Sequence, residues 1–189
     1  MGAMNRLSRW TVNLTTERRA RRTLDRLGRA LDVPPEAQVL ELGSGGGGML
    51  ALLHERYRPA RLVGTDFDPA QVEAARAFLT RRWGALPQTL ELREADALAL
   101  PFPDASFDLV FAMMMLHHVE DHHAHVGPFV RRPQALAEVR RVLRPGGRFV
   151  YSEMFQREAV LAALRDLRFD RRFLRSAWRH DLAICTAPG

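Results

Sequence analysis

Residues Val39–Gly48 read VLELGSGGGG, an apolar run that ends in a glycine-rich turn. Glycines between a strand and a helix let a ligand approach the backbone and leave the first N–H groups of the helix free. Two spacings fit: a dinucleotide loop on Gly43, Gly45 and Gly48, and an acidic-x-G-x-G-x-G loop on Glu41, Gly43, Gly45 and Gly47. The Glu41 carboxylate would repel a pyrophosphate and attract a cationic amine or sulfonium, so it favours the second.

On both sides of this turn, short apolar runs alternate with longer segments whose apolar residues have helical spacing. The predicted strands are Gln38–Leu42, Arg61–Thr65, Thr89–Arg93, Phe107–Met113, Arg148–Glu153, Asp170–Ala177 and Leu182–Thr186, the last two around a turn at Arg179–Asp181. The predicted helices are Thr16–Leu31, Met49–Tyr57, Pro69–Trp83, Pro133–Leu143 and Gln156–Leu167. This alternation predicts an α/β fold, with a mostly parallel sheet and helices on both faces. Ligands of such sheets bind outside the carboxyl ends of the strands, at the topological switch point.

Acidic residues follow the second and third predicted strands as well. Asp66 lies 18 residues after Gly48, a position from which a carboxylate binds ribose hydroxyls. The next residue, Phe67, can lie against an adenine ring, and Asp68 is expected to cap the helix that opens at Pro69.

Asp96 follows the third strand. Its carboxylate can accept a hydrogen bond from the exocyclic amine of an adenine, and the backbone N–H of Ala97 can donate to the ring. Acidic residues at three successive strand ends therefore predict a site for a nucleoside that carries a positive charge.

Several motifs occur in order along the chain: Glu41–Gly47, Asp66, Asp96-Ala97, Leu100–Pro103, Phe107–Val110, Leu116–His118 and Arg141–Gly147. As a set they resemble the class I S-adenosylmethionine-dependent methyltransferases, most closely the small-molecule branch that includes the ubiquinone/menaquinone methyltransferases. The resemblance covers Val39–Glu153. It implies a Rossmann-like, seven-stranded sheet with an antiparallel last strand, and S-adenosylmethionine as the methyl donor.

The resemblance also implies roles for individual residues. Glu41 would face the methionine amine, and the turn Gly43, Ser44, Gly45 and Gly47 would admit the methionine part. Asp66 would hold the ribose, Phe67, Asp96 and Ala97 the adenine, and Met113 would offer its backbone to the methionine part. The run Met113–Met115 departs from the small residues usual at this point, which leaves the polarity of the acceptor open.

Five histidines lie between positions 117 and 125. Structural or solvated roles are the first interpretation, since His117 and His118 belong to a family motif that needs no metal. For a general base the best candidates are His118 and His122, which follow the fourth strand and can titrate near neutrality. No metal site is predicted.

The chain has 189 residues and a formal charge of +6, carried by arginine without any lysine. Residues 1–35 are predicted to form an N-terminal helical segment, and residues 36–189 the methyltransferase domain. The segment 16–31 reads as a basic amphipathic helix, for which docking on the domain is the first interpretation and peripheral contact with a membrane the second. Cys185 is the one cysteine, which excludes a disulfide framework and fits the cytoplasm.

The sequence thus predicts a methyltransferase that acts on a small molecule, with a quinone-like or lipid acceptor among the options. A non-catalytic protein that binds S-adenosylmethionine or a partner on the same fold remains the alternative. Met113–Leu116 stand where DNA amino-methyltransferases carry an Asp/Asn-Pro-Pro-aromatic turn, and no Pro-Cys nucleophile occurs, so a nucleic-acid substrate is disfavoured. Glu41 and Asp96 disfavour a nicotinamide dehydrogenase. The oligomeric state is left open.

Overall fold

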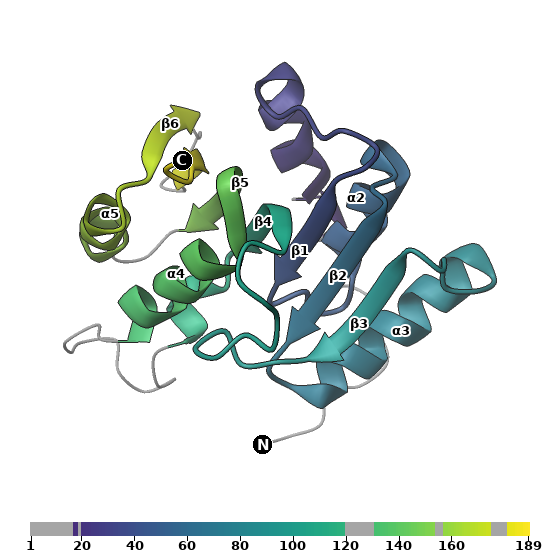
Figure 1. The fold of residues 1–189 in the computed structure, drawn as a ribbon. Coiled ribbons are helices and arrows are strands. Elements are labelled where there is room, and N and C mark those ends of the chain that lie inside the picture. Colours follow the sequence, from purple (N-terminus) through teal and green to yellow (C-terminus); the bar gives the residue numbers. More distant parts are fainter. Residues whose placement is uncertain (1–16, 19, 120–130, 154–156, 175–180) are drawn as a thin grey trace.

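The computed structural model describes residues 17–18, 20–119, 131–153, 157–174 and 181–189. A central sheet separates two layers of helices (Figure 1). The strands are β1 (Gln38–Leu42), β2 (Arg61–Asp66), β3 (Leu90–Glu94), β4 (Phe107–Met113), β5 (Leu143–Glu153), β6 (Asp170–Leu174) and β7 (Asp181–Thr186). After β1 the α-helices are α2 (Gly48–Tyr57), α3 (Pro69–Trp83), α4 (Arg131–Val142) and α5 (Arg157–Asp166). The 3-10 helices are η1 (Gly28–Ala30) and η2 (Leu116–His118). Residues 20–27 are helical as well and run directly into η1.

The sheet has seven strands in the order β3-β2-β1-β4-β5-β7-β6. β1 to β5 pair in parallel, whereas β7 pairs antiparallel with both β5 and β6. The predicted α/β architecture with an antiparallel last strand is therefore confirmed. The chain leaves β1 toward β2 on one side and returns to β4 on the other, so the switch point lies beyond the carboxyl end of β1.

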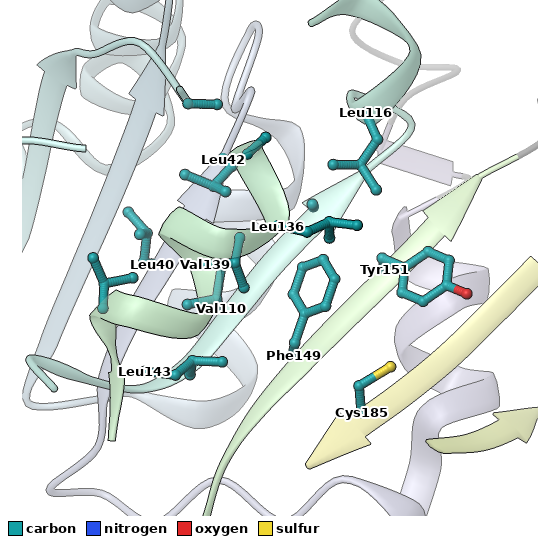
Figure 2. Packing of buried hydrophobic residues seen from close by; sticks show 14 of the residues in the cluster. Leu40, Leu42, Val110, Leu116, Leu136, Val139, Leu143, Phe149, Tyr151 and Cys185 are labelled. Atoms are coloured by element: carbon teal, nitrogen blue, oxygen red, sulfur yellow. The ribbon is translucent and has the colours of Figure 1, made fainter. Parts of the chain in front are cut away.

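Alternate residues of the strands fill two hydrophobic clusters, one on each face of the sheet. Leu40, Val110 and Phe149 pack with Leu136 and Val139 of α4, as Figure 2 shows. On the other face, buried residues of the sheet pack with α2 and the N-terminal helix; they include Val39, Leu62, Phe111, Leu50, Leu24 and Leu27. This two-sided burial explains why the central strands read as continuous apolar runs. No helix in the described ranges is both long and apolar enough to cross a membrane.

Most predicted elements are present, and their boundaries differ by a few residues. The prediction that the helix from Pro133 includes Leu143 was wrong: α4 spans Arg131–Val142, because Leu143 already pairs with Phe107 in the sheet. β5 then makes an irregular excursion around Gly146 before regular pairing resumes at Arg148.

The C-terminal hairpin differs slightly as well. Asp181 was expected in the turn but belongs to β7, where it pairs with Glu153. β6 ends at Leu174, and residues 175–180 lie outside the described ranges, as do Thr16 and Gln156 at the starts of two predicted helices.

Gly64 brings the first helix after the glycine turn close to the sheet. It lies in the middle of β2, and a Cβ at this position would be 2.4 Å from Cδ1 of Leu50 in α2. Since a buried leucine has little room to withdraw in a close-packed core, only a glycine lets α2 lie at this depth.

We expect Gly64→Ala to destabilise the protein by about 1–3 kcal/mol through overpacking. Chemical denaturation measures this change. The matched test is the Gly64→Ala/Leu50→Ala double variant, in which the clash is gone, so its loss should be smaller than the sum of the two single losses. Simple additivity would show that the two positions do not constrain each other.

Candidate functional site at the carboxyl edge of the sheet

The glycine turn is pressed against the segment that follows β4. Gly43 has a positive φ of 65°, and a Cβ there would lie 2.6 Å from Cβ of Met115. Gly45 also has a positive φ, but a Cβ there would meet nothing within 4 Å. The turn therefore has a packed side at Gly43 and an open side at Gly45, where a ligand can approach the backbone.

Asp66 connects three loops at this edge. Its side chain accepts hydrogen bonds from the backbone N–H of Gly45 at 2.8 Å and of Asp68 at 3.1 Å. Its carbonyl accepts from the N–H of Ala95 at 3.0 Å, just before Asp96. Asp66 thus holds the segments after β1, β2 and β3 side by side, as the order of these strands in the sheet requires. Each carboxylate oxygen keeps a second lone pair for a ligand hydroxyl.

Glu41 is a buried carboxyl without a full set of partners. It is 2% exposed, and its Oε2 forms no hydrogen bond with the described residues. Burial, and next the nearby charge of Asp66, raise the pKa of Glu41 well above its ordinary value. The hydroxyl of Ser44, also buried, has no hydrogen-bond partner there either. Unsatisfied buried polar atoms are rare, and two of them, one near the end of β1 and one in the turn that follows, fit a bound cationic, hydrogen-bonding group.

The residues expected near an adenine lie at the neighbouring strand ends. Phe67 is 73% exposed, the one large hydrophobic side chain so exposed among the described residues. Asp96 is exposed and accepts a hydrogen bond from the N–H of Leu98 at 2.9 Å, whereas Ala97 is buried. An aromatic face in solvent and a carboxylate with a remaining oxygen are what a flat, amine-bearing ring requires. Asp68 caps α3 by accepting from the N–H of Ala70, as predicted.

Beyond β4 the structure adds a pair that the sequence analysis missed. Nδ1 of His117 lies 3.0 Å from Oε1 of Glu153, and the backbone N–H of His117 donates to Oε2 at 3.1 Å. Glu153 is buried at the end of β5, the strand next to β4. Its position at the end of another apolar run is the sequence signal by which it could have been found. A carboxylate on Nδ1 leaves the lone pair of the neutral ring on Nε2.

The other two candidate positions of this region are placed differently. His118 is exposed on η2, with its ring centroid 3.9 Å from that of His117. His122 lies outside the described residues, as do His123 and His125. Met113 is half-buried where β4 ends, on the far side of β1 from β2. In the described ranges no cluster of three His, Cys, Asp or Glu residues could hold a metal ion.

A family model described as methyltransferase domain matches residues 40–151. The chain is 36% identical over 150 residues to a demethylmenaquinone methyltransferase of Thermus thermophilus, covering 79% of this chain and 59% of that protein. A fatty-acid O-methyltransferase of Mycolicibacterium smegmatis is 38% identical over 116 residues, which cover 61% of this chain and 36% of that protein. The chain thus spans less than two thirds of the length of these relatives.

Solved structures share the fold at low identity. A chain from the complex of the Haloferax volcanii Trm112 methyltransferase activator with a methyltransferase superposes with a TM-score of 0.74 at 19% identity, with both chains covered completely. The [4+2]-cyclase SpnF superposes with a TM-score of 0.67 at 20% identity, over 89% of this chain and 81% of that one. These structures show the fold alone. The match over residues 40–151 and the 36% identity to the Thermus thermophilus protein show that the chain belongs to the S-adenosylmethionine-dependent methyltransferase family.

Proposed function

We propose that this protein transfers a methyl group from S-adenosylmethionine to a small, largely apolar acceptor of the quinone or lipid class. The observation that carries the proposal is Glu41, a buried carboxyl of β1 whose Oε2 has no hydrogen-bond partner among the described residues. It lies two residues before the glycine turn, which is open at Gly45. An unsatisfied buried carboxyl costs folding free energy. Such a group is typical of a binding site, since its charge becomes favourable only when a cationic group binds.

Each binding residue has a specific task in this proposal. Glu41 and Ser44 receive the ammonium and carboxylate part of the methionine, with Gly43, Gly45 and Gly47 opening the backbone to it. Asp66 binds the ribose hydroxyls, Phe67 stacks on the adenine beside Asp96 and Ala97, and the backbone at Met113 closes the site from β4. The sulfonium supplies an activated methyl group, so the protein contributes positioning and the exclusion of water.

An acceptor that must lose a proton needs a base near the end of β4. His118 and His122 are the candidates from sequence, and we now place His117 before them. Glu153 holds its Nδ1 and its backbone N–H, which fixes the ring in one orientation with Nε2 as the basic nitrogen. The ring of His118 is exposed on η2, with its centroid 3.9 Å from that of His117.

The acceptor class rests on two supports. Relatives are named for demethylmenaquinone, fatty acids and phthiotriol dimycocerosates, all of which contain large apolar parts. Met113 and Met114 are half-buried at the end of β4, where the acceptor would approach, and methionine adapts to apolar ligands of irregular shape. Cys185 is no candidate nucleophile, because burial raises its pKa to about 12. A cytoplasmic location remains part of this proposal.

A non-catalytic binding protein on the same fold is the second candidate. The [4+2]-cyclase SpnF has the same fold, so this fold does not by itself require methyl transfer. Binding of S-adenosylmethionine without turnover on any acceptor would support this alternative.

S-adenosylhomocysteine should raise the unfolding temperature of the protein, and NAD should not. Asp66→Ala should weaken S-adenosylhomocysteine binding at least tenfold, about 1.4 kcal/mol, measured by calorimetry. Asp68→Ala is the matched control, because it removes a neighbouring carboxylate that caps α3 and leaves the affinity unchanged. Protection by NAD, or equal effects of the two variants, would contradict the assignment.

Glu41→Gln should separate stability from binding. Because burial raises the pKa of Glu41, the folded protein binds more protons than the unfolded chain between the unfolded pKa, about 4.3, and the raised value, so stability falls as pH rises through that window. The variant should therefore be more stable than the wild type at neutral pH, on the order of 1 kcal/mol, with a smaller difference in acid. Its affinity for S-adenosylhomocysteine should fall about tenfold, whereas Glu41→Asp retains the charge and more of the affinity. Reduced stability together with unchanged affinity would oppose this role.

His117→Ala should lower kcat by about 10²-fold on hydroxynaphthoquinone or fatty-acid acceptors that the wild type methylates. Glu153→Gln should act in the same direction and shift the acidic limb of the pH–rate profile, which loss of structure alone would not do. Binding of S-adenosylhomocysteine should stay unchanged in both. If His118→Ala has the larger effect, the base is His118 and the His117–Glu153 pair is structural.

A further inference from the structure

The N-terminal helix presents a row of arginines to solvent. Its buried side consists of Ala20, Leu24 and Leu27, which pack into the cluster shared with α2. Arg18, Arg22 and Arg26 recur every four residues on the opposite side, Arg29 follows in η1 after Gly28, and all four are exposed. These four residues are here called the arginine stripe.

The stripe arginines share one helix, and none of them has a carboxylate partner among the described residues. Some arginines elsewhere on the surface engage carboxylates, as in Arg61–Glu91 at 2.8 Å and Arg141–Glu138 at 2.7 Å, whereas others, such as Arg58 and Arg81, form no ion pair with the described residues. The stripe arginines form no ion pair with any residue in the described ranges.

The acidic residues of the same helix do not neutralise the stripe. Glu17 is largely buried and is engaged by Arg82 at 3.2 Å, whereas Asp25 is 65% exposed and is engaged by Arg56 at 3.0 Å. The outer side of the helix therefore carries four arginines and one acidic residue, Asp25, whose charge is offset by Arg56 of α2. Such a row is complementary to a surface of closely spaced negative charges.

The stripe begins next to the candidate site. The backbone N of Glu17 lies 3.4 Å from the place that a Cβ of Gly48 would occupy, and Gly48 is the first residue of α2 after the glycine turn. Arg18 therefore stands at the end of the helix that is close to the carboxyl edge of the sheet. A surface that binds the stripe comes close to the edge where the acceptor would enter.

We propose that the arginine stripe docks this protein on the surface of an anionic lipid bilayer. The contact is electrostatic and confined to the headgroups, because the apolar side of the helix is buried in the protein and cannot insert. A bilayer is favoured over a nucleic acid for two reasons. No aromatic side chain lies between positions 17 and 31 to stack on bases. The second reason rests on the proposed function, since an acceptor of the quinone or lipid class dissolves in the bilayer.

Co-sedimentation with vesicles tests the docking surface. The full chain should bind vesicles of phosphatidylcholine with phosphatidylglycerol, should not bind pure phosphatidylcholine, and should be released when the ionic strength rises from about 0.05 to about 0.5 M. Replacing all four stripe arginines by glutamine should weaken binding by more than about tenfold, since each basic residue near an anionic surface contributes about fivefold. Glutamine is a good helix former, so the helix should be retained.

The matched control changes Arg58, Arg81, Arg165 and Arg168 to glutamine. These four are exposed, form no ion pair with the described residues and are spread over the molecule, so the net charge changes equally. The control should retain vesicle binding within about threefold. An equal loss of vesicle binding in both variants would show that only the overall charge matters and would overturn the proposal. Absence of vesicle binding by the wild type would overturn it as well. So would competition between duplex DNA and the vesicles for the stripe. Protection by S-adenosylhomocysteine, measured on every variant, reports on the proposed function independently.

Discussion

The hydrogen bonds of Asp66 are the interaction on which the candidate site depends. One side chain accepts the N–H groups of Gly45 and Asp68, and the carbonyl of the same residue accepts that of Ala95. Three loops that are separate in sequence are thereby held in one arrangement at the carboxyl edge of the sheet. Because each bond is charge-assisted or part of a strand end, the edge is organised before any ligand binds, which reduces the ordering required on binding.

Glu41 has the opposite effect on the stability of the ligand-free protein. A buried carboxyl beside another carboxylate destabilises the ligand-free protein, and no described residue satisfies its Oε2. Natural proteins retain such groups where function requires them, since most positions free of that requirement can be replaced by better-packed residues. In the proposed function, organisation by Asp66 and the unpartnered carboxyl of Glu41 together make a site that is shaped in advance and selective for a cationic ligand.

The two sides of the sheet have different consequences for function. On one face of the sheet, α4 and α5 complete a hydrophobic layer that includes Met115 and Leu116. The next residue, His117, is hydrogen-bonded to Glu153 of β5. The opposite layer places the N-terminal helix against α2 and leaves its arginines outside. A domain boundary near residue 35 stays a prediction, although Leu24 and Leu27 share one hydrophobic cluster with Val39 of the domain.

The sequence by itself determined the alternation of strands and helices, the antiparallel last strand through the family resemblance, and the acidic strand ends Glu41, Asp66 and Asp96. These are local signals: apolar runs, glycine turns and helix caps are set by a few adjacent residues. It did not reveal that Leu143 joins β5 instead of continuing α4, since pairing with Phe107 across 36 positions decides that boundary. Nor did it reveal the pairing of His117 with Glu153 or the lack of neutralisation at the arginine stripe. Both depend on which side chains meet after the strands are ordered in the sheet, and that ordering is a property of the tertiary structure alone.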